Sequence, residues 1–163
     1  MTASPFDQPY RGGFADGEHR FALTVYFEDT DTAGIVYHAN YLRFFERARS
    51  DMLRAAGIDQ RRAMDDGVGA YAVSHMDIKW RRPAKLDDDL VVISRVSGVR
   101  AASCSIHQRV MRGREVLAEA AVTAALLTPE GRPRRQPTDW VERFRSIATT
   151  EEGTACPSSR RPT

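Results

Sequence analysis

Apolar and polar residues alternate along several segments of this chain with the two-residue period of a β-strand that buries one face. The first such segment places Phe21, Leu23, Val25 and Phe27 on one face, which predicts a strand over residues 20–27. Alternation or enrichment in β-branched residues predicts four further strands, over residues 76–81, 90–99, 104–111 and 115–127, the last two joined by a turn at Arg112-Gly113.

A helical period replaces the alternation between Asn40 and Gly57. Apolar residues recur there at steps of three or four, namely Tyr41, Phe45, Ala48, Met52 and Ala56. Asn40 is a good N-cap, and Gly57 suits the C-terminal stop of a helix. An apolar helix and a mostly antiparallel sheet must cover each other, so the pattern alone predicts an α+β domain of two layers.

A chain of 163 residues with 42% hydrophobic residues is long enough for one domain with a substantial core and short for two. Residues 1–18 and 149–163 lack periodicity, so we expect a flexible N-terminal tail, a domain over residues 19–148 and a disordered C-terminal tail. No segment resembles a secretion signal, and none approaches the roughly 20 apolar residues that span a bilayer. We therefore expect a cytoplasmic protein without stable membrane insertion.

The formal net charge of +2 is small, but arginines are grouped at residues 81–82 and within residues 132–135. Such groups could meet the phosphates of a nucleotide-like ligand, or form a solvated face. We expect no nucleic-acid partner, because the groups lack interleaved aromatic residues and a base-reading motif. Cys104, Cys156 and the histidines have neither metal-ligand spacing nor the density of a disulfide scaffold, so we expect no metal and no cofactor.

The segment from Tyr26 to Tyr41 combines carboxylates, a glycine and a histidine directly before the predicted helix. The first N–H groups of a helix have no partner within the helix, and the helix dipole is positive at this end. These groups can hydrogen-bond an oxygen that gains negative charge during acyl transfer. Asp31 and His38 would lie beside such an oxyanion site, so the segment is typical of a small active site.

The chain resembles the Tol-Pal-associated acyl-CoA thioesterases, a bacterial branch of the 4-hydroxybenzoyl-CoA thioesterase group, in the motifs EDTD at residues 28–31, HANY at residues 38–41 and FFERAR at residues 44–49. The similarity continues through residues 77–88 to about residue 144. The resemblance implies an α+β hotdog fold, in which an antiparallel β-sheet wraps around one long central α-helix. It also implies an acyl-CoA substrate and a homodimer or homotetramer with active sites at the subunit interface.

Asp31 is the first candidate catalytic residue. A carboxylate at this place can attack the thioester carbonyl and give an anhydride, or act as general base on a water molecule, and the sequence does not choose between the two. The alternative, for an isolated Asp-Thr-Ala-Gly segment, is a turn that Asp31 caps.

His38 is the second candidate, because in similar thioesterases the histidine at this motif position is functional. It could orient Asp31, contact the thioester or move a proton near neutral pH, and packing at the helix start is the alternative. Its backbone N–H, or that of a neighbour, is the first candidate for the oxyanion donor.

Four cationic residues flank the end of a predicted strand: Lys79, Arg81, Arg82 and Lys85. They are candidates to bind the phosphates of coenzyme A, although the same pattern fits surface charge on an edge strand. Tyr37, next to His38, is a further substrate-binding candidate. Glu46 is the runner-up carboxylate, since some hotdog thioesterases place a catalytic glutamate on the central helix. Its arginine neighbours favour an ion pair instead.

The chain departs from the resemblance at Phe27, four residues before Asp31, where the family members compared have a tyrosine. The hydroxyl is absent, and the neighbouring Tyr26 would face the other side of a strand. This departure supports an alternative function, the binding of acyl-CoA or acyl carrier protein with little hydrolysis. The main prediction is hydrolysis of an acyl-CoA to free acid and coenzyme A.

Overall fold

The computed structural model of the protein describes residues 4–148. Two short 3-10 turns, Pro5–Asp7 and Phe27–Asp29, precede the main helix. The longer elements, in chain order, are β1 (Gly13–Ala15), β2 (Glu18–Thr24), α1 (Asn40–Ala55), α2 (Gln60–Asp65), β3 (Ala70–Trp80), β4 (Asp89–Val99), β5 (Ser103–Arg112), β6 (Glu115–Leu127) and α3 (Thr138–Ile147).

The six strands form one antiparallel sheet in the order β1-β2-β4-β5-β6-β3. The four strands predicted after the helix are all present, although β3 begins at Ala70 and not at residue 76. Gly113, with a φ of 58°, supplies the left-handed residue of the tight turn between β5 and β6. β3 lies at one end of the sheet, so its 11 residues present a free backbone edge.

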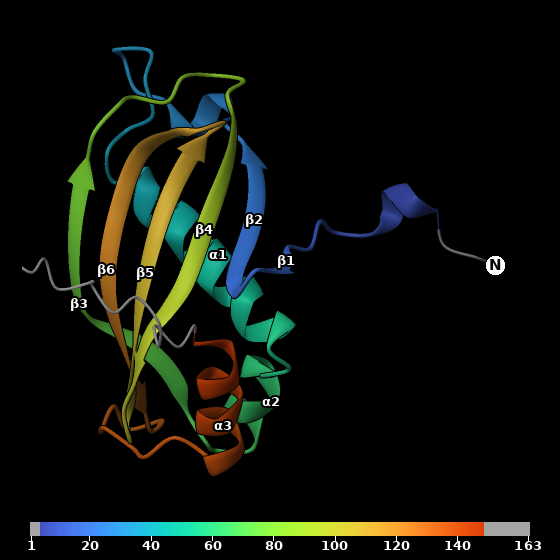
Figure 1. The fold of residues 1–163 in the computed structure, drawn as a ribbon, viewed down its shortest axis with the longest axis vertical. Helices are drawn as coiled ribbons and strands as arrows, with labels where there is room; N and C mark the ends of the chain where they lie inside the picture. The colour runs from blue at the N-terminus through green and yellow to red at the C-terminus, as the bar shows by residue number, and fades with distance from the viewer. Residues whose placement is uncertain (1–3, 149–163) are drawn as a thin grey trace, which may run out of the picture.

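Helix α1 lies across one face of the sheet and packs on β2 and β4 (Figure 1). Its apolar stripe is buried, with Phe44, Phe45 and Ala48 fully inaccessible to solvent. These side chains meet Val92 and Val110 of the sheet in one continuous core. Full burial of a phenylalanine contributes roughly 1.5–3 kcal/mol, so the two aromatic residues alone hold α1 firmly in place.

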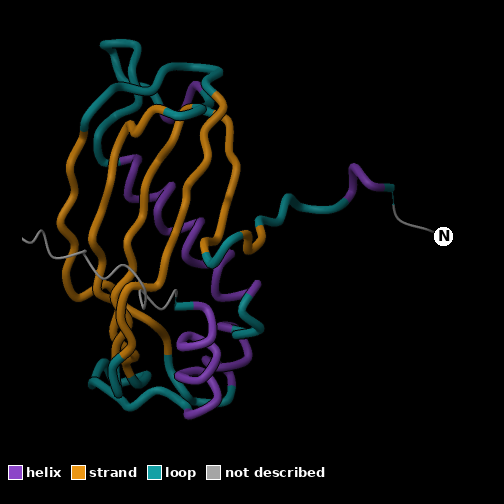
Figure 2. The backbone as a smooth tube through the Cα atoms, in the orientation of Figure 1, coloured by secondary structure: helices purple, strands orange, loops and turns teal. Residues whose placement is uncertain are grey.

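A second apolar cluster closes the lower end of the molecule, where α2 and α3 lie beside the C-terminal part of α1 (Figures 1 and 2). Met52 and Ile58 meet Phe144 of α3 there, and all three are buried. Neither α2 nor α3 was predicted from the pattern. Gly57 has a φ of 78° and ends α1 as expected.

The segment expected to be an N-terminal tail contains β1, which pairs with β2. Asp51 of α1 holds this part of the chain, because its Oδ2 accepts the backbone N–H of Gly12 at 2.8 Å and lies 3.0 Å from Nε2 of His19. His19 is fully buried, and its Nδ1 has no hydrogen-bond partner within the described residues. The folded domain therefore begins earlier than residue 19, while residues 149–163 of the expected C-terminal tail lie outside the described residues.

Strand β2 ends at Thr24, and not at residue 27 as the alternation predicted. The Asp29 carboxylate accepts the backbone N–H of Tyr26 at 2.9 Å, which turns the chain into the 3-10 helix Phe27–Asp29. Phe27 is consequently 82% exposed and does not lie on the buried face of a strand. In one chain, a tyrosine hydroxyl at this position would point to solvent.

Candidate active site

The loop between β2 and α1 is held by the backbone of Asp29. Its carbonyl oxygen accepts the N–H of Tyr37 at 2.9 Å and the side-chain amide of Asn40 at 2.9 Å. The carboxylate of the same residue is buried and closes the preceding turn. Asp29 is therefore a structural residue that fixes the loop carrying Asp31 and His38.

Asp31 begins a tight turn on the surface of this loop. Its Oδ1 accepts the N–H of Ala33 at 2.8 Å, and its own N–H donates to the carbonyl of Ile35 at 2.9 Å. Gly34 completes the turn with a φ of 74°, where a side chain would be strained. Within residues 4–148 the second carboxylate oxygen, Oδ2, has no hydrogen-bond partner, so the turn orients the carboxylate and leaves one oxygen available.

Helix α1 begins at Asn40, but Asn40 is not the N-cap that the sequence suggested. Ala39 is the N-cap and has no polar side chain to cap the helix, while the amide of Asn40 donates to the carbonyl of Asp29. No hydrogen bond inside the described part of the chain uses the backbone N–H of His38 or Ala39. Unpaired N–H groups at the positive end of a helix dipole can donate hydrogen bonds to an oxygen that carries negative charge.

Aromatic rings hold the imidazole of His38. It is tilted against Tyr37, with ring centres 4.5 Å apart, and meets Trp80 edge to face at 5.8 Å. The indole N–H of Trp80 also donates to the carbonyl oxygen of His38 at 3.3 Å. Trp80 thus connects the end of β3 to the start of α1, and sequence reasoning missed this role.

A hollow of about 250 Å³ opens beside His38 and is lined by Ile35, Val36, Tyr41, Trp80, Arg81, Arg82 and Pro83. The Tyr41 hydroxyl accepts the N–H of Ala84 at 3.1 Å and so fixes the segment after β3 against α1, and burial raises its pKa. Arg81 forms an ion pair with Glu119, and the Nε of Arg82 lies 3.5 Å from the carboxylate of Glu115.

The structure brings only some of the predicted substrate-binding residues together. Arg81 and Arg82 line the hollow beside His38, and the ring of Tyr37 is tilted against that of His38. Lys79 lies on the other face of the sheet, beside Asp77, His107 and Glu119.

Lys85 pairs its backbone with Ile35, and its side chain is exposed. Asp31 does not line the hollow and lies on the turn next to it.

Glu46, the runner-up carboxylate, lies on the second turn of α1 and accepts the hydroxyl of Ser50 at 2.6 Å. It lines a different cavity, farther along the helix than the hollow beside His38. Within residues 4–148 no group of three or more histidine, cysteine or acidic residues could hold a metal ion, and no helix is both long and apolar enough to cross a membrane.

Comparison with known proteins identifies the family. The family model of the thioesterase-like superfamily matches residues 25–146. The acyl-CoA thioesterase YbgC of Haemophilus influenzae is 42% identical over 110 residues, which cover 68% of this chain and 81% of the relative. The acyl-CoA thioester hydrolase YbgC of Escherichia coli O157:H7 is 37% identical over 128 residues, covering 77% of this chain and 95% of the relative.

Solved structures show the same fold. The crystal structure of a probable thioesterase from Bartonella henselae has a TM-score of 0.69 at 40% identity and covers 74% of this chain and 99% of its own. A 1,4-dihydroxy-2-naphthoyl-CoA thioesterase from Synechocystis has a TM-score of 0.72 at 23% identity, covers 78% of this chain and 96% of its own, and supports the fold alone. The prediction of an α+β hotdog fold is confirmed. The chain belongs to the thioesterase-like superfamily and, within it, to the Tol-Pal-associated YbgC acyl-CoA thioesterases.

Proposed function

We propose that this protein hydrolyses the thioester of an acyl-CoA to a free acid and coenzyme A, with Asp31 as the catalytic carboxylate. The observation that carries the proposal is the pairing of two features on one short loop. The carboxylate of Asp31 is oriented through Oδ1 and has Oδ2 available, and the N–H groups of His38 and Ala39 at the start of α1 are unpaired within the described residues.

The reaction follows from these two features. The N–H groups at the helix start hydrogen-bond the thioester carbonyl oxygen and stabilise the negative charge that it gains when the carbonyl is attacked. Oδ2 of Asp31 either attacks the carbonyl carbon or takes the proton of an attacking water molecule. Coenzyme A leaves as a thiolate, which needs little protonation.

The side chain of His38 is a smaller contributor in this proposal than its backbone. The ring is held between Tyr37 and Trp80, so it positions the loop and the thioester beside it. Arg82, with Tyr37 at the rim and Lys85 on the adjoining loop, would meet the phosphates of coenzyme A. Arg81 is engaged by Glu119, and Lys79 faces away, so neither is retained as a main phosphate contact.

The free edge of β3 supports a homodimer. Edge strands of this length are usually paired or covered, and this one carries apolar side chains that are 45% exposed at Val73 and 50% exposed at Trp80. We propose that two copies join their β3 edges antiparallel about a twofold axis perpendicular to the sheet. In such a dimer the same surface of each subunit meets its counterpart, so the assembly is closed. The sites beside His38 then lie close to the subunit boundary.

Release of the free thiol of coenzyme A from a panel of acetyl, butyryl, octanoyl, palmitoyl and benzoyl thioesters tests the proposal. Turnover on at least one of them, increasing in proportion to enzyme, is the expected result. Calorimetric binding of acyl-CoA or of acyl carrier protein without thiol release would instead support the alternative of a binding module. His38→Ala should lower kcat by less than a substitution of Asp31, because the backbone N–H is retained.

A further inference from the structure

The chain before β1 forms an arm, residues 4–11, that extends away from the folded domain beside β2 (Figures 1 and 2). Its first turn, Pro5–Asp7, buries none of its residues, and Phe6 is 94% exposed. The family model begins at residue 25, so the arm lies outside the part of the chain that carries the thioesterase similarity. The proposed reaction leaves the arm without a role.

Local contacts give the outer part of the arm a defined shape. The N–H of Phe6 donates to the Ser4 hydroxyl at 3.2 Å, and the N–H of Ser4 donates to the carboxylate of Asp7 at 3.2 Å, which together close a capping box. Pro5 and Pro9 each fix one backbone φ angle. Ordering such a segment costs conformational entropy, and its exposed side chains offset none of that cost within their own domain. The arm is therefore shaped for burial against another surface.

The root of the arm, Tyr10 to Gly12, is fixed to the domain. The N–H of Gly12 donates to the buried carboxylate of Asp51 on α1 at 2.8 Å. The ring of Tyr10 meets that of Phe21 edge to face, with centres 5.5 Å apart, and its hydroxyl accepts the N–H of Ala22 at 3.3 Å. The arm consequently leaves the domain from a fixed point at the outer edge of β2.

A hollow of about 580 Å³, which we call the β2 hollow, lies next to this root and is bordered by the Tyr10 side chain. It is lined by residues of β2, β4, α1 and the loop after β2, among them Leu23, Leu90, Val91 and Arg47. An apolar cavity of roughly 150 Å³ accepts a benzene ring, so the β2 hollow has room for a phenyl ring and its neighbours. Within residues 4–148 the guanidinium of Arg47 has no hydrogen bond or ion pair, and it is available to an acidic group.

The arm and the β2 hollow are complementary in chemistry. The arm presents the ring of Phe6 beside Oδ1 of Asp7, the carboxylate oxygen that the capping box leaves unused. The hollow offers apolar side chains beside the cation of Arg47. Because the arm extends away from its own domain, the occupant that matches the hollow is the arm of a second copy (Figure 1).

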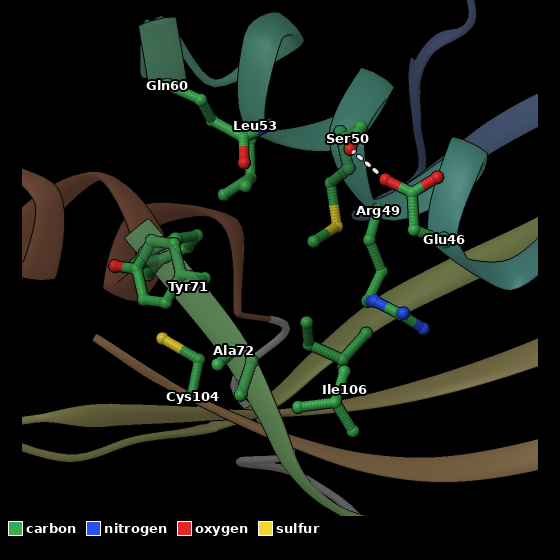
Figure 3. A pocket seen from close by; sticks show the side chains of 13 residues that line it. Glu46, Arg49, Ser50, Leu53, Gln60, Tyr71, Ala72, Cys104 and Ile106 are labelled. Carbon is green, nitrogen blue, oxygen red and sulfur yellow. Dashed lines mark hydrogen bonds between the residues drawn. The ribbon is translucent and has the colours of Figure 1, made fainter. Parts of the chain in front are cut away.

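The cavity between α1, β3 and α3 is a poorer match for the ring (Figure 3). Its volume is about 120 Å³, which is less than the roughly 150 Å³ that accepts benzene. Glu46, Arg49 and Gln60 line it together with apolar side chains, and the Ser50 hydroxyl donates to Glu46 there, as the dashed line in Figure 3 marks. Size and polarity therefore both favour the β2 hollow.

The reach of the arm limits how two copies can meet. Four residue steps separate Phe6 from Tyr10, which is at most about 14 Å of chain. Since each β2 hollow lies beside its own root, Phe6 enters the partner's hollow only if the two roots lie about this far apart. A twofold axis between two facing β2 edges meets this condition, and both arms are then exchanged in one closed contact.

We propose that the N-terminal arm is exchanged between two copies of this chain, with Phe6 in the partner's β2 hollow and Asp7 paired with the partner's Arg47. This interface goes beyond the proposed reaction and does not rest on it. Strands β1 and β3 lie at opposite ends of the sheet, so the exchange leaves the β3 edge free. If the β3 edges pair as proposed above, arm exchange joins two such dimers into a tetramer.

Removal of the arm tests the exchange. A chain that lacks residues 1–9 keeps Tyr10 and Gly12, and light scattering on a sizing column should find half as many chains per particle as for the full chain. Phe6→Ala should weaken the association at least about a hundredfold, because two rings are lost from each exchange and burial of each is worth roughly tenfold or more. Met64→Ala, an exposed apolar residue on α2, is the control and should change nothing. Equal particle masses with and without the arm would overturn the proposal.

A charge cycle tests the pair of Asp7 and Arg47. Asp7→Asn keeps a side-chain oxygen for the capping box and removes the charge. It should weaken association of the native chain, but strengthen association of Arg47→Asp, in which two carboxylates would repel each other. Arg145→Asp, an exposed arginine on α3, controls for the change in net charge. An effect of the same sign in both backgrounds would contradict the pairing.

A disulfide crosslink distinguishes exchange from an arm that folds back onto its own domain. Phe6→Cys and Ala22→Cys, combined in a Cys156→Ser chain, place one thiol on the arm and one at the β2 hollow, while Cys104 is buried. After mild oxidation, exchange should give crosslinked pairs of chains on a non-reducing denaturing gel, and each single-cysteine variant is a control. A crosslink confined to single chains would refute the exchange. None of these measurements uses thioester hydrolysis, so their outcome is independent of the proposed function.

Discussion

The buried pair of His19 and Asp51 makes the stability of this domain sensitive to acid. His19 is inaccessible to solvent, and burial lowers its pKa from the ordinary value of 6.5, although the hydrogen bond and charge of Asp51 oppose this. Among residues 4–148 the other charge at the pair is Arg54, whose guanidinium lies 3.3 Å from Asp51. Protonation of His19 would strengthen its bond to Asp51 but would place a charge in the core. Since burial has the larger influence on its pKa, the folded domain should be less stable when His19 is protonated.

The size of the effect follows from proton linkage. Because the pKa is lower in the folded chain than in the unfolded chain, the stability is fully present above about pH 6.5 and is lost as the pH falls below it. At about pH 5.5 a proton bound only by the unfolded chain removes at most about 1.4 kcal/mol from the free energy of unfolding. For a chain of 163 residues, that lowers Tm by roughly 3–6 °C.

The loss of Tm can be measured by thermal unfolding, monitored by circular dichroism, between about pH 7.5 and pH 5.5. This pH range lies on both sides of the ordinary histidine pKa. His19→Gln is the control, because the glutamine amide can still donate to Asp51 but does not titrate. The variant should lose clearly less Tm than the native protein over this pH range. An equal loss in both proteins would refute the assignment of the acid sensitivity to His19.

Four further substitutions test particular contacts. In urea unfolding, Gly69→Ala should lower the free energy of unfolding by roughly 3 kcal/mol or more, since its Cβ would lie 1.9 Å from a β6 carbonyl oxygen. Gly113→Ala should lower it by only about 1 kcal/mol, because Gly113 has a φ of 58° but a Cβ there would lie in open space. Gln108→Leu should lower it by about 2 kcal/mol in the same assay, because it leaves a buried backbone carbonyl and a guanidinium without their partner. Trp80→Phe, which removes the donor to the His38 carbonyl, should reduce kcat/KM about fivefold with little change in Tm.

The regular elements could be predicted because their burial is one-sided. The stripe of α1 and the alternation of β4 to β6 record which face meets the core, and the structure has these elements almost where the pattern placed them. Helix α3 has a signal in the sequence as well, because Trp140, Val141, Phe144 and Ile147 recur at helical spacing after the predicted sheet. The ends of elements depended on single side chains and could not be predicted.

Asp29 illustrates why the loop escaped prediction. Its carboxylate stops β2 and its carbonyl recruits the Asn40 amide, so Asn40 does not cap the helix that it begins. Such bonds join residues whose distance in space the sequence does not give. The two-residue period of a strand could have separated Lys79 from Trp80, because neighbours on β3 face opposite sides. The roles of Asp31 and His38 stay predictions.

The most direct measurement is the kcat/KM of Asp31→Asn beside that of the native protein on its best acyl-CoA. The asparagine oxygen can still accept the N–H of Ala33, so the turn is kept while the carboxylate charge is removed. Glu28→Gln, an exposed neighbour on the same loop, controls for a general loss of charge. We expect a loss of roughly two orders of magnitude or more for Asp31→Asn and near-native activity for Glu28→Gln. Near-native turnover by Asp31→Asn would contradict the central role of its carboxylate.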